Sequence, residues 1–141
     1  MIYYNYETDF SIDNEVLFSN WLELVILSEA KQLGEISYIF CDNEYLNKVN
    51  IEFLNHDTYT DIITFDYSLG NEVIADIYIS VDMVKENARE YSESFETELL
   101  RVMSHGILHC CGYKDKSDKD SLLMRSKEDE KIKLFHVEHK V

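Results

Sequence analysis

Two histidines in the segment SHGILHCCGYKD, residues 104–115, are the side chains of this chain best suited to metal chemistry. His105 and His109 are four positions apart, so on a helix they lie one turn apart on the same face. Two imidazoles at that spacing can bind one metal ion, as they do in zinc hydrolases. Paired histidines are also common as ordinary surface or core residues, so the spacing alone does not decide the question.

Asp115 is the expected third ligand. It follows Gly112, and glycine readily adopts the left-handed backbone conformation that ends many helices. Such a turn brings Asp115 back toward His105 and His109. Two nitrogen ligands and one carboxylate leave a fourth position for water, as in catalytic zinc sites. We therefore expect one Zn²⁺ per chain, with a metal-activated water as the reactive group.

The cysteines beside the histidines are expected to pack rather than to bind metal. Cys110 and Cys111 are adjacent, whereas zinc–thiolate sites usually space their cysteines as C-x-x-C. With Cys41 they make an odd number in a chain that starts without a recognisable export signal, which favours reduced thiols.

The elements that must position these residues form a single α+β domain over residues 1–141, with about four strands in a small mixed sheet and about five helices. The histidines lie near the end of a strongly apolar helix, which is expected to be central and buried. Gly106, between them, indicates close approach of another element. The expected strands are 1–7, 35–41, 60–67 and 72–80, and the expected helices are 11–31, 42–55, 80–92, 94–112 and 117–135.

Several polar or glycine residues are expected to mark the helix ends. Gly34 is expected to end the first helix, and Gly112 the fourth. The candidate N-caps are Ser11 or Asp13, Asp42, Ser80 or Asp82, and Ser94.

The charge of the chain limits the partners that it can bind. Its 13 basic and 28 acidic residues give a net charge of −15, so binding to RNA requires a local basic patch, a metal or a protein partner. The basic residues nearest the histidines either meet phosphates or form a charge-balanced surface. No apolar run is long enough for a membrane helix, and a cytoplasmic location is expected. The basic residues nearest the histidines are Lys114, Lys116, Lys119, Arg125 and Lys127.

Three segments together resemble the YbeY family of bacterial metal-dependent endoribonucleases, which take part in ribosomal RNA maturation. HGILHCCGYKD is similar to the family signature HGxLHLxGYDH, NHDTYTDIITFDY to its DxPTDVLSF strand, and ADIYIS to its GDIxIS strand. The three matches occur in the family's order and span roughly residues 35–130. The resemblance implies a YbeY-like metallohydrolase domain that cleaves single-stranded ribosomal RNA, with the ribosome or ribosomal proteins as further candidate partners.

The chain departs from the family pattern at two positions. Asp115 stands where the family has a third histidine, and a carboxylate is a harder ligand that tolerates manganese or magnesium better than imidazole does. Leu54 stands where the family usually has an arginine, and His56 is the nearest cation. A guanidinium is well suited to phosphate recognition, so its loss bears on activity.

Three polar residues in the two matched strands are expected near the site by analogy with the family. Asp61 and Thr64 also have ordinary explanations, as a strand-entry turn and a β-branched strand residue. Asp76 lies between Ala75 and Ile77 in an apolar strand, and a buried carboxylate needs a partner. A hydrogen bond to a metal-binding histidine would supply one.

Two other function classes remain open. One is a non-catalytic ribosome- or protein-binding module that keeps a structural metal. The other, a zinc peptidase, is disfavoured because Gly106 occupies the position of the glutamate in H-E-x-x-H. No general base is identified from the sequence. His136 and His139 near the C-terminus are expected to lie in an exposed tail.

Overall fold

The structure is a computed structural model that describes residues 1–138, so His139 lies outside the described residues. It confirms the expected four strands and five helices in one α+β domain. Among the described residues, no helix combines the length and apolar content that crossing a membrane requires. The elements are β1 (Ile2–Tyr6), α1 (Glu15–Ser28), β2 (Gln32–Cys41), α2 (Asn43–Leu54), β3 (Ile62–Asp66), β4 (Glu72–Ser80), α3 (Val81–Glu90), α4 (Phe95–Cys110) and α5 (Asp118–Glu138).

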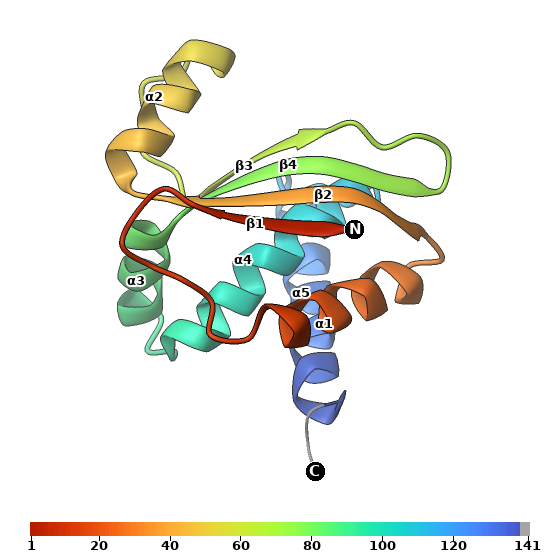
Figure 1. The fold of residues 1–141 in the computed structure, drawn as a ribbon. Coiled ribbons are helices and arrows are strands. Elements are labelled where there is room, and N and C mark those ends of the chain that lie inside the picture. The colour runs from red at the N-terminus through yellow and green to blue at the C-terminus, as the bar shows by residue number, and fades with distance from the viewer. Residues whose placement is uncertain (139–141) are drawn as a thin grey trace.

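The sheet is mixed, as expected, with the strand order β1-β2-β4-β3. β1 and β2 are parallel, as are β2 and β4, whereas β3 and β4 form an antiparallel hairpin. Helices α1, α3, α4 and α5 lie on one side of the sheet, and α2 stands at one end on the other side (Figure 1). Because α4 is covered by the sheet and by its neighbouring helices, it is the central helix of the domain.

Helix α4 is fixed on the middle of the sheet by close packing and by a buried hydrogen bond. The hydroxyl of Tyr38 on β2 donates to the carbonyl of Met103 at 2.9 Å. A Cβ atom on Gly106 would lie 3.1 Å from Ile77 Cδ1 and 3.2 Å from Ile62 Cδ1, which is tighter than ordinary packing. The glycine therefore allows the helix to approach β3 and β4, as its place between the histidines predicted.

Side-chain capping is confirmed for three helices and corrected for the first. In α2, α3 and α4 the N-cap side chain accepts a hydrogen bond from a backbone amide of the first turn. These N-caps are Asp42, Ser80 and Ser94. Helix α1 is capped by Asn14, not by Ser11 or Asp13. The chain enters the helix at Glu15, so Asn14 is the residue that immediately precedes the first turn.

Gly34 does not end the first helix. That helix ends at Ser28, and Ala30, with φ of 60°, turns the chain into β2. Gly34 lies within β2, where an added Cβ would come within 2.7 Å of the carbonyl oxygen of Val73 on β4. The glycine is required by the close approach of two strand backbones at an irregular point in their pairing.

Candidate metal centre

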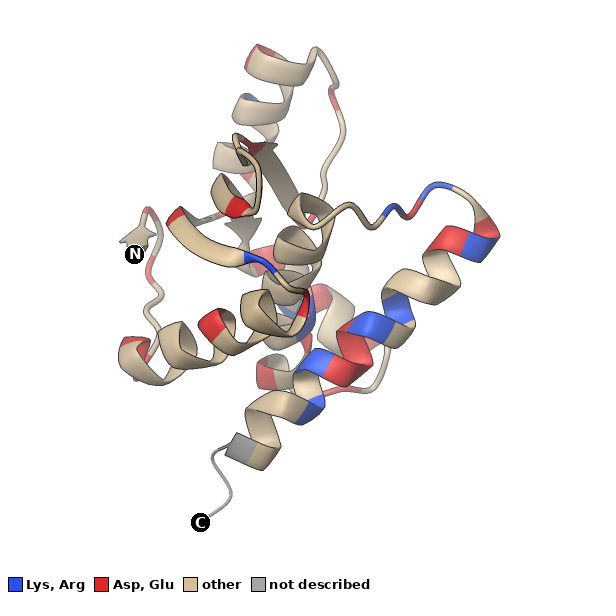
Figure 2. Cartoon of the chain, turned by 90° about the vertical axis from the view of Figure 1, so that its right-hand side faces the viewer, with Lys and Arg blue, Asp and Glu red and all other residues tan. Residues whose placement is uncertain are grey.

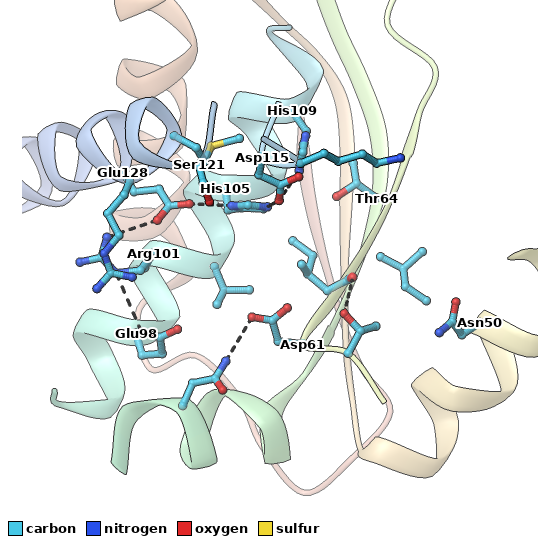
Figure 3. A pocket seen from close by; sticks show the side chains of 18 of the residues that line it. Asn50, Asp61, Thr64, Glu98, Arg101, His105, His109, Asp115, Ser121 and Glu128 are labelled. Carbon is cyan, nitrogen blue, oxygen red and sulfur yellow. Dashed lines mark hydrogen bonds and ion pairs between the residues drawn. The ribbon is translucent and has the colours of Figure 1, made fainter. Parts of the chain in front are cut away.

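The three predicted ligands converge at the C-terminal end of α4. His105 and His109 lie on its last turns, with ring centroids 4.5 Å apart. Asp115 lies in the loop that leads to α5, and its Oδ2 is 3.2 Å from Nε2 of His105 and 3.4 Å from Nε2 of His109. One ligand atom from each residue lies within 4.8 Å of the other two. Figure 3 shows the three side chains pointing toward one another.

The turn after α4 places Asp115. Gly112 follows the helix with φ of 104°, a conformation that side chains disfavour. The amide of Tyr113 donates back to the carbonyl of Leu108 at 3.0 Å, which closes the helix end. The chain therefore reverses at Gly112, as the sequence predicted, and Asp115 returns to the histidines.

Hydrogen bonds fix the orientation of both imidazoles. Nδ1 of His105 is 2.6 Å from Oε2 of Glu128, and Nδ1 of His109 is 3.0 Å from the carbonyl oxygen of Tyr113. A carbonyl and a carboxylate can only accept, so each Nδ1 carries the proton and donates. In the neutral imidazoles this leaves the lone pair on Nε2, which faces Asp115.

The donor set fits a divalent metal ion. Tetrahedral zinc with bonds of about 2.0–2.1 Å separates neighbouring ligand atoms by about 3.4 Å. The measured separations between the histidine nitrogens and the Asp115 oxygen, 3.2 and 3.4 Å, agree with that value. Two unprotonated nitrogens and one carboxylate oxygen are ligands that zinc accepts.

Glu128 connects His105 to a buried arginine. Its Oε1 accepts from Nη1 of Arg101 at 3.2 Å, while its Oε2 accepts from His105. Arg101 also pairs through Nη2 with Asp129 at 2.9 Å. Burial of His105 opposes its charged form, but the Glu128 hydrogen bond and nearby carboxylates outweigh burial and raise the pKa of His105.

A cavity of about 890 Å³ opens beside the three ligands. Side chains from α2, β3, α3, α4 and α5, together with the loops between them, line it. The cationic side chains on its wall are Arg101, Lys116 and Arg125. Leu54 and His56, the two residues considered in the sequence analysis for a phosphate-binding role, also line it. Leu54 therefore places an apolar side chain on the cavity wall.

Asp61 and Thr64 line the cavity, as expected by analogy. Asp61 Oδ2 accepts from Nδ2 of Asn87 at 3.2 Å, and burial raises the pKa of Asp61. Thr64 is paired with Ile77 across the β3–β4 ladder and therefore faces α4. Neither residue supplies the hydrogen bonds to the Nδ1 atoms of the histidines described above.

The structure does not bring Asp76 to the site, which corrects the sequence expectation. Strand residues alternate between the two faces of a sheet, and Ile77 faces α4. Asp76 therefore faces the opposite side, where its paired residue Phe65 packs with Tyr78 near α2. Its side chain is partly exposed, so it has no need of a buried partner.

Sequence reasoning missed three charged residues around the site, namely Glu98, Arg101 and Glu128. Glu98 and Arg101 precede His105 by seven and four positions, so they continue the stripe of the histidines along α4. A search for polar residues at helical spacing on this apolar helix would have found them. Glu128 has no such local signal, because it reaches the site from α5.

The cysteines pack beside the site, as expected. Cys110 and Cys111 are free thiols that pack against the main core, and Cys41 is buried. Burial raises the pKa of Cys110 to about 12 and that of Cys111 to about 11. Neither thiol belongs to the group of His105, His109 and Asp115 whose ligand atoms converge.

Together, the fold and the site define the class of the protein. A single α+β domain carries two histidines and one carboxylate on the wall of an open cavity. Catalytic metal centres have this open arrangement, whereas structural zinc sites are closed by four protein ligands. The arrangement is that of a metal-dependent enzyme.

The chain belongs to the YbeY family, because the family model described as Endoribonuclease YbeY matches residues 3–136. Endoribonuclease YbeY of Flavobacterium johnsoniae is 65% identical over 138 residues, which cover 98% of this chain and 99% of that protein. The same enzyme of Flavobacterium psychrophilum is 64% identical over 137 residues, covering 97% and 98%.

A solved structure agrees with this assignment. The solution structure of TM1509 from Thermotoga maritima superimposes with a TM-score of 0.68 at 30% identity, over 98% of this chain and 91% of that one. The comparisons confirm the predicted family, fold class and enzyme class, which is that of a nuclease.

Proposed function

We propose that this chain is a zinc-dependent endoribonuclease that cleaves single-stranded ribosomal RNA during ribosome maturation in the cytoplasm. The observation that carries the proposal is the convergence of His105, His109 and Asp115 at the edge of the cavity, in a chain of the YbeY family. When bound there, zinc supplies a Lewis acid that polarises a phosphoryl oxygen and lowers the pKa of a water molecule.

The chain's own residues prepare this site for the metal. Glu128 and the carbonyl of Tyr113 hold the Nδ1 protons of the two histidines, so both Nε2 lone pairs face the ion. Arg101 holds Glu128 in place through its Nη1 atom. The ligand geometry therefore exists before substrate binds.

Two cations on the cavity wall are the proposed phosphate contacts. Arg101 is engaged by Glu128 and Asp129, whereas Lys116 and Arg125 line the cavity without such buried pairs. Arg125 lies over the ring of Tyr91, 5.6 Å from its centroid. These two residues would take the role of the arginine that Leu54 replaces.

The distribution of charged residues favours RNA binding at the cavity, where Lys116 and Arg125 lie. Acidic and basic residues alternate along α5, whereas Lys114 and Lys116 lie in the loop before it (Figure 2). A net charge of −15 repels a polyanion elsewhere, so a metal and a local cation pair are needed to attract it. We expect a single strand rather than a duplex to enter the cavity, because unpaired bases can stack on side chains and hydrogen-bond through their exposed edges.

The test compares metal-loaded wild type with His109→Ala on one RNA, supplied single-stranded and as a duplex. We expect wild type to cleave the single strand faster than the duplex, a chelator to abolish cleavage and added zinc to restore it. His109→Ala should be folded and inactive. Metal-loaded wild type that is as inert as the variant on every RNA would overturn the proposal.

The second candidate function is a non-catalytic ribosome- or protein-binding module that keeps the metal for stability. Leu54 in place of the family arginine and the strongly acidic composition favour it. It predicts that ribosomal particles retain wild type while RNA stays intact. Metal-dependent cleavage by wild type decides against it.

A further inference from the structure

Glu98 is a buried carboxyl group on the wall of the cavity that the proposed chemistry does not use. It lies on α4, is 4% exposed and lines the same cavity as the metal ligands. Its Oε1 atom has no hydrogen-bond partner among the described residues. Figure 3 shows its carboxyl group on the side of the cavity that faces Asp61.

The charges around Glu98 do not balance. Arg101, on the next turn, donates its two Nη groups to Glu128 and Asp129. Only its Nε approaches Glu98, at 3.9 Å, and this Nε also lacks a hydrogen-bond partner. One guanidinium thus faces three carboxyl groups, so Glu98 shares Arg101 with Glu128 and Asp129 and has the longest of the three contacts.

The other charged groups near Glu98 add to this excess. Asp61 at the start of β3 and Glu128 on α5 repel a charge on Glu98, while Arg125 on α5 attracts it. Burial is the largest effect and, against the attraction of Arg101, raises the pKa of Glu98 to about 7. The carboxyl group therefore exchanges its proton near neutral pH.

The position of Glu98 points to a binding role rather than to the scissile bond. Glu98 precedes His105 by seven residues, about 10 Å along the helix axis. Proton transfer needs heavy atoms at about 3 Å, so a bond broken beside the histidines is out of its reach. A strand of RNA that lies along the cavity places a neighbouring phosphate closer to it.

We propose that Glu98 contacts a backbone phosphate of bound RNA as a neutral carboxylic acid, so that a chain whose Glu98 is ionised takes up a proton when RNA enters the cavity. The proposal rests on the proposed RNA substrate. An ionised Glu98 would repel the phosphate, whereas the protonated oxygen donates a hydrogen bond to a phosphoryl oxygen. The solvent supplies the proton, which returns to it when RNA leaves.

The test measures the affinity of zinc-loaded protein for a short single-stranded RNA with 2′-O-methyl riboses, checked to be intact after each titration. Wild type should bind about tenfold more weakly at pH 8 than at pH 6, since only the neutral form of a group with a pKa of about 7 is competent. Glu98→Gln keeps the shape of the side chain and stays neutral, so the RNA affinity of this variant should not show the tenfold fall between pH 6 and pH 8. Glu96→Gln, an exposed carboxyl group on the same helix, is the matched control and should behave as wild type.

The outcomes separate this proposal from the proposed function. Wild type that binds RNA with the same pH dependence as Glu98→Gln overturns the role of Glu98 only. Absence of RNA binding by all variants at every pH overturns the proposed function and this inference together. An NMR titration of the Glu98 side-chain carboxyl in wild type is an independent check, and a midpoint near the ordinary glutamate value would also overturn the inference.

Discussion

Oε2 of Glu128 lies 2.6 Å from Nδ1 of His105, although the two residues are 23 positions apart and lie on different helices. The same carboxylate accepts from Arg101, so α5 orients a candidate ligand that α4 carries. The candidate metal centre is therefore assembled by the packing of α5 on α4, not by the histidine helix alone.

Glu128→Gln should weaken zinc binding about 10–100-fold, because an amide is a poorer acceptor for the Nδ1 proton and carries no charge. Competition with a chromophoric chelator measures the affinity, and thermal unfolding checks the fold. Glu130→Gln, an exposed carboxylate on the same helix, should leave the affinity unchanged. Equal affinities of the Glu128 variant and wild type would show that His105 needs no orienting partner.

Asp115→Ala and Asp115→His test the third ligand. Removal of the carboxylate should lower zinc affinity at least tenfold, because two imidazoles then bind the ion alone. Histidine restores three nitrogen ligands, so Asp115→His should keep zinc but bind manganese more weakly than wild type. Calorimetric titrations with both ions measure this, and an Asp115→Ala protein with wild-type affinities would exclude Asp115 as a ligand.

Gly112→Ala should destabilise the fold by about 1–2 kcal/mol, since a side chain at φ of 104° is strained. It should also weaken zinc binding, because the turn places Asp115 and the carbonyl that holds His109. Gly70→Ala in the β3–β4 turn is the matched control, with φ of 61°. It should lower stability in urea unfolding and leave zinc affinity intact.

Glu98→Gln should raise stability above neutral pH. The pKa of Glu98 is raised to about 7 in the folded chain from 4.5, so the folded state holds its proton more tightly than the unfolded state. The raised pKa of Glu98 adds to the free energy of unfolding. This contribution is fully present below about pH 4.5 and is lost as the pH rises through about 7. The glutamine variant avoids this loss, on the order of 3 kcal/mol. Urea unfolding at pH 5 and 8 measures it, and an equal difference from wild type at both pH values would contradict the shift.

The convergence of the three candidate ligands could be predicted from the sequence because these residues are local. His105, His109, Gly112 and Asp115 lie within eleven residues, where helical spacing and one glycine turn determine the geometry. Four strands and five helices followed from periodicity in the same way. Glu128 could not be predicted from local spacing, because its approach to His105 depends on how α5 packs on α4.

The corrections at Asp76 and Gly34 have different physical reasons. Asp76 was expected near the histidines, although Ala75 and Ile77 on either side are core residues and strand alternation turns it away from them. Gly34 was expected to end a helix, whereas it permits close contact between β2 and β4. Strand alternation, which is local, determines the direction of Asp76, whereas contact between two strands distant in sequence determines the role of Gly34.

X-ray absorption at the zinc edge of protein loaded with one equivalent of zinc tests the central claim most directly. We expect two imidazole nitrogens at about 2.0–2.1 Å and oxygen at about 2.0–2.2 Å, supplied by His105, His109 and Asp115. A sulfur shell at about 2.3 Å, which would assign the metal to Cys110 or Cys111, would contradict it. Failure of the protein to retain stoichiometric zinc would contradict it equally.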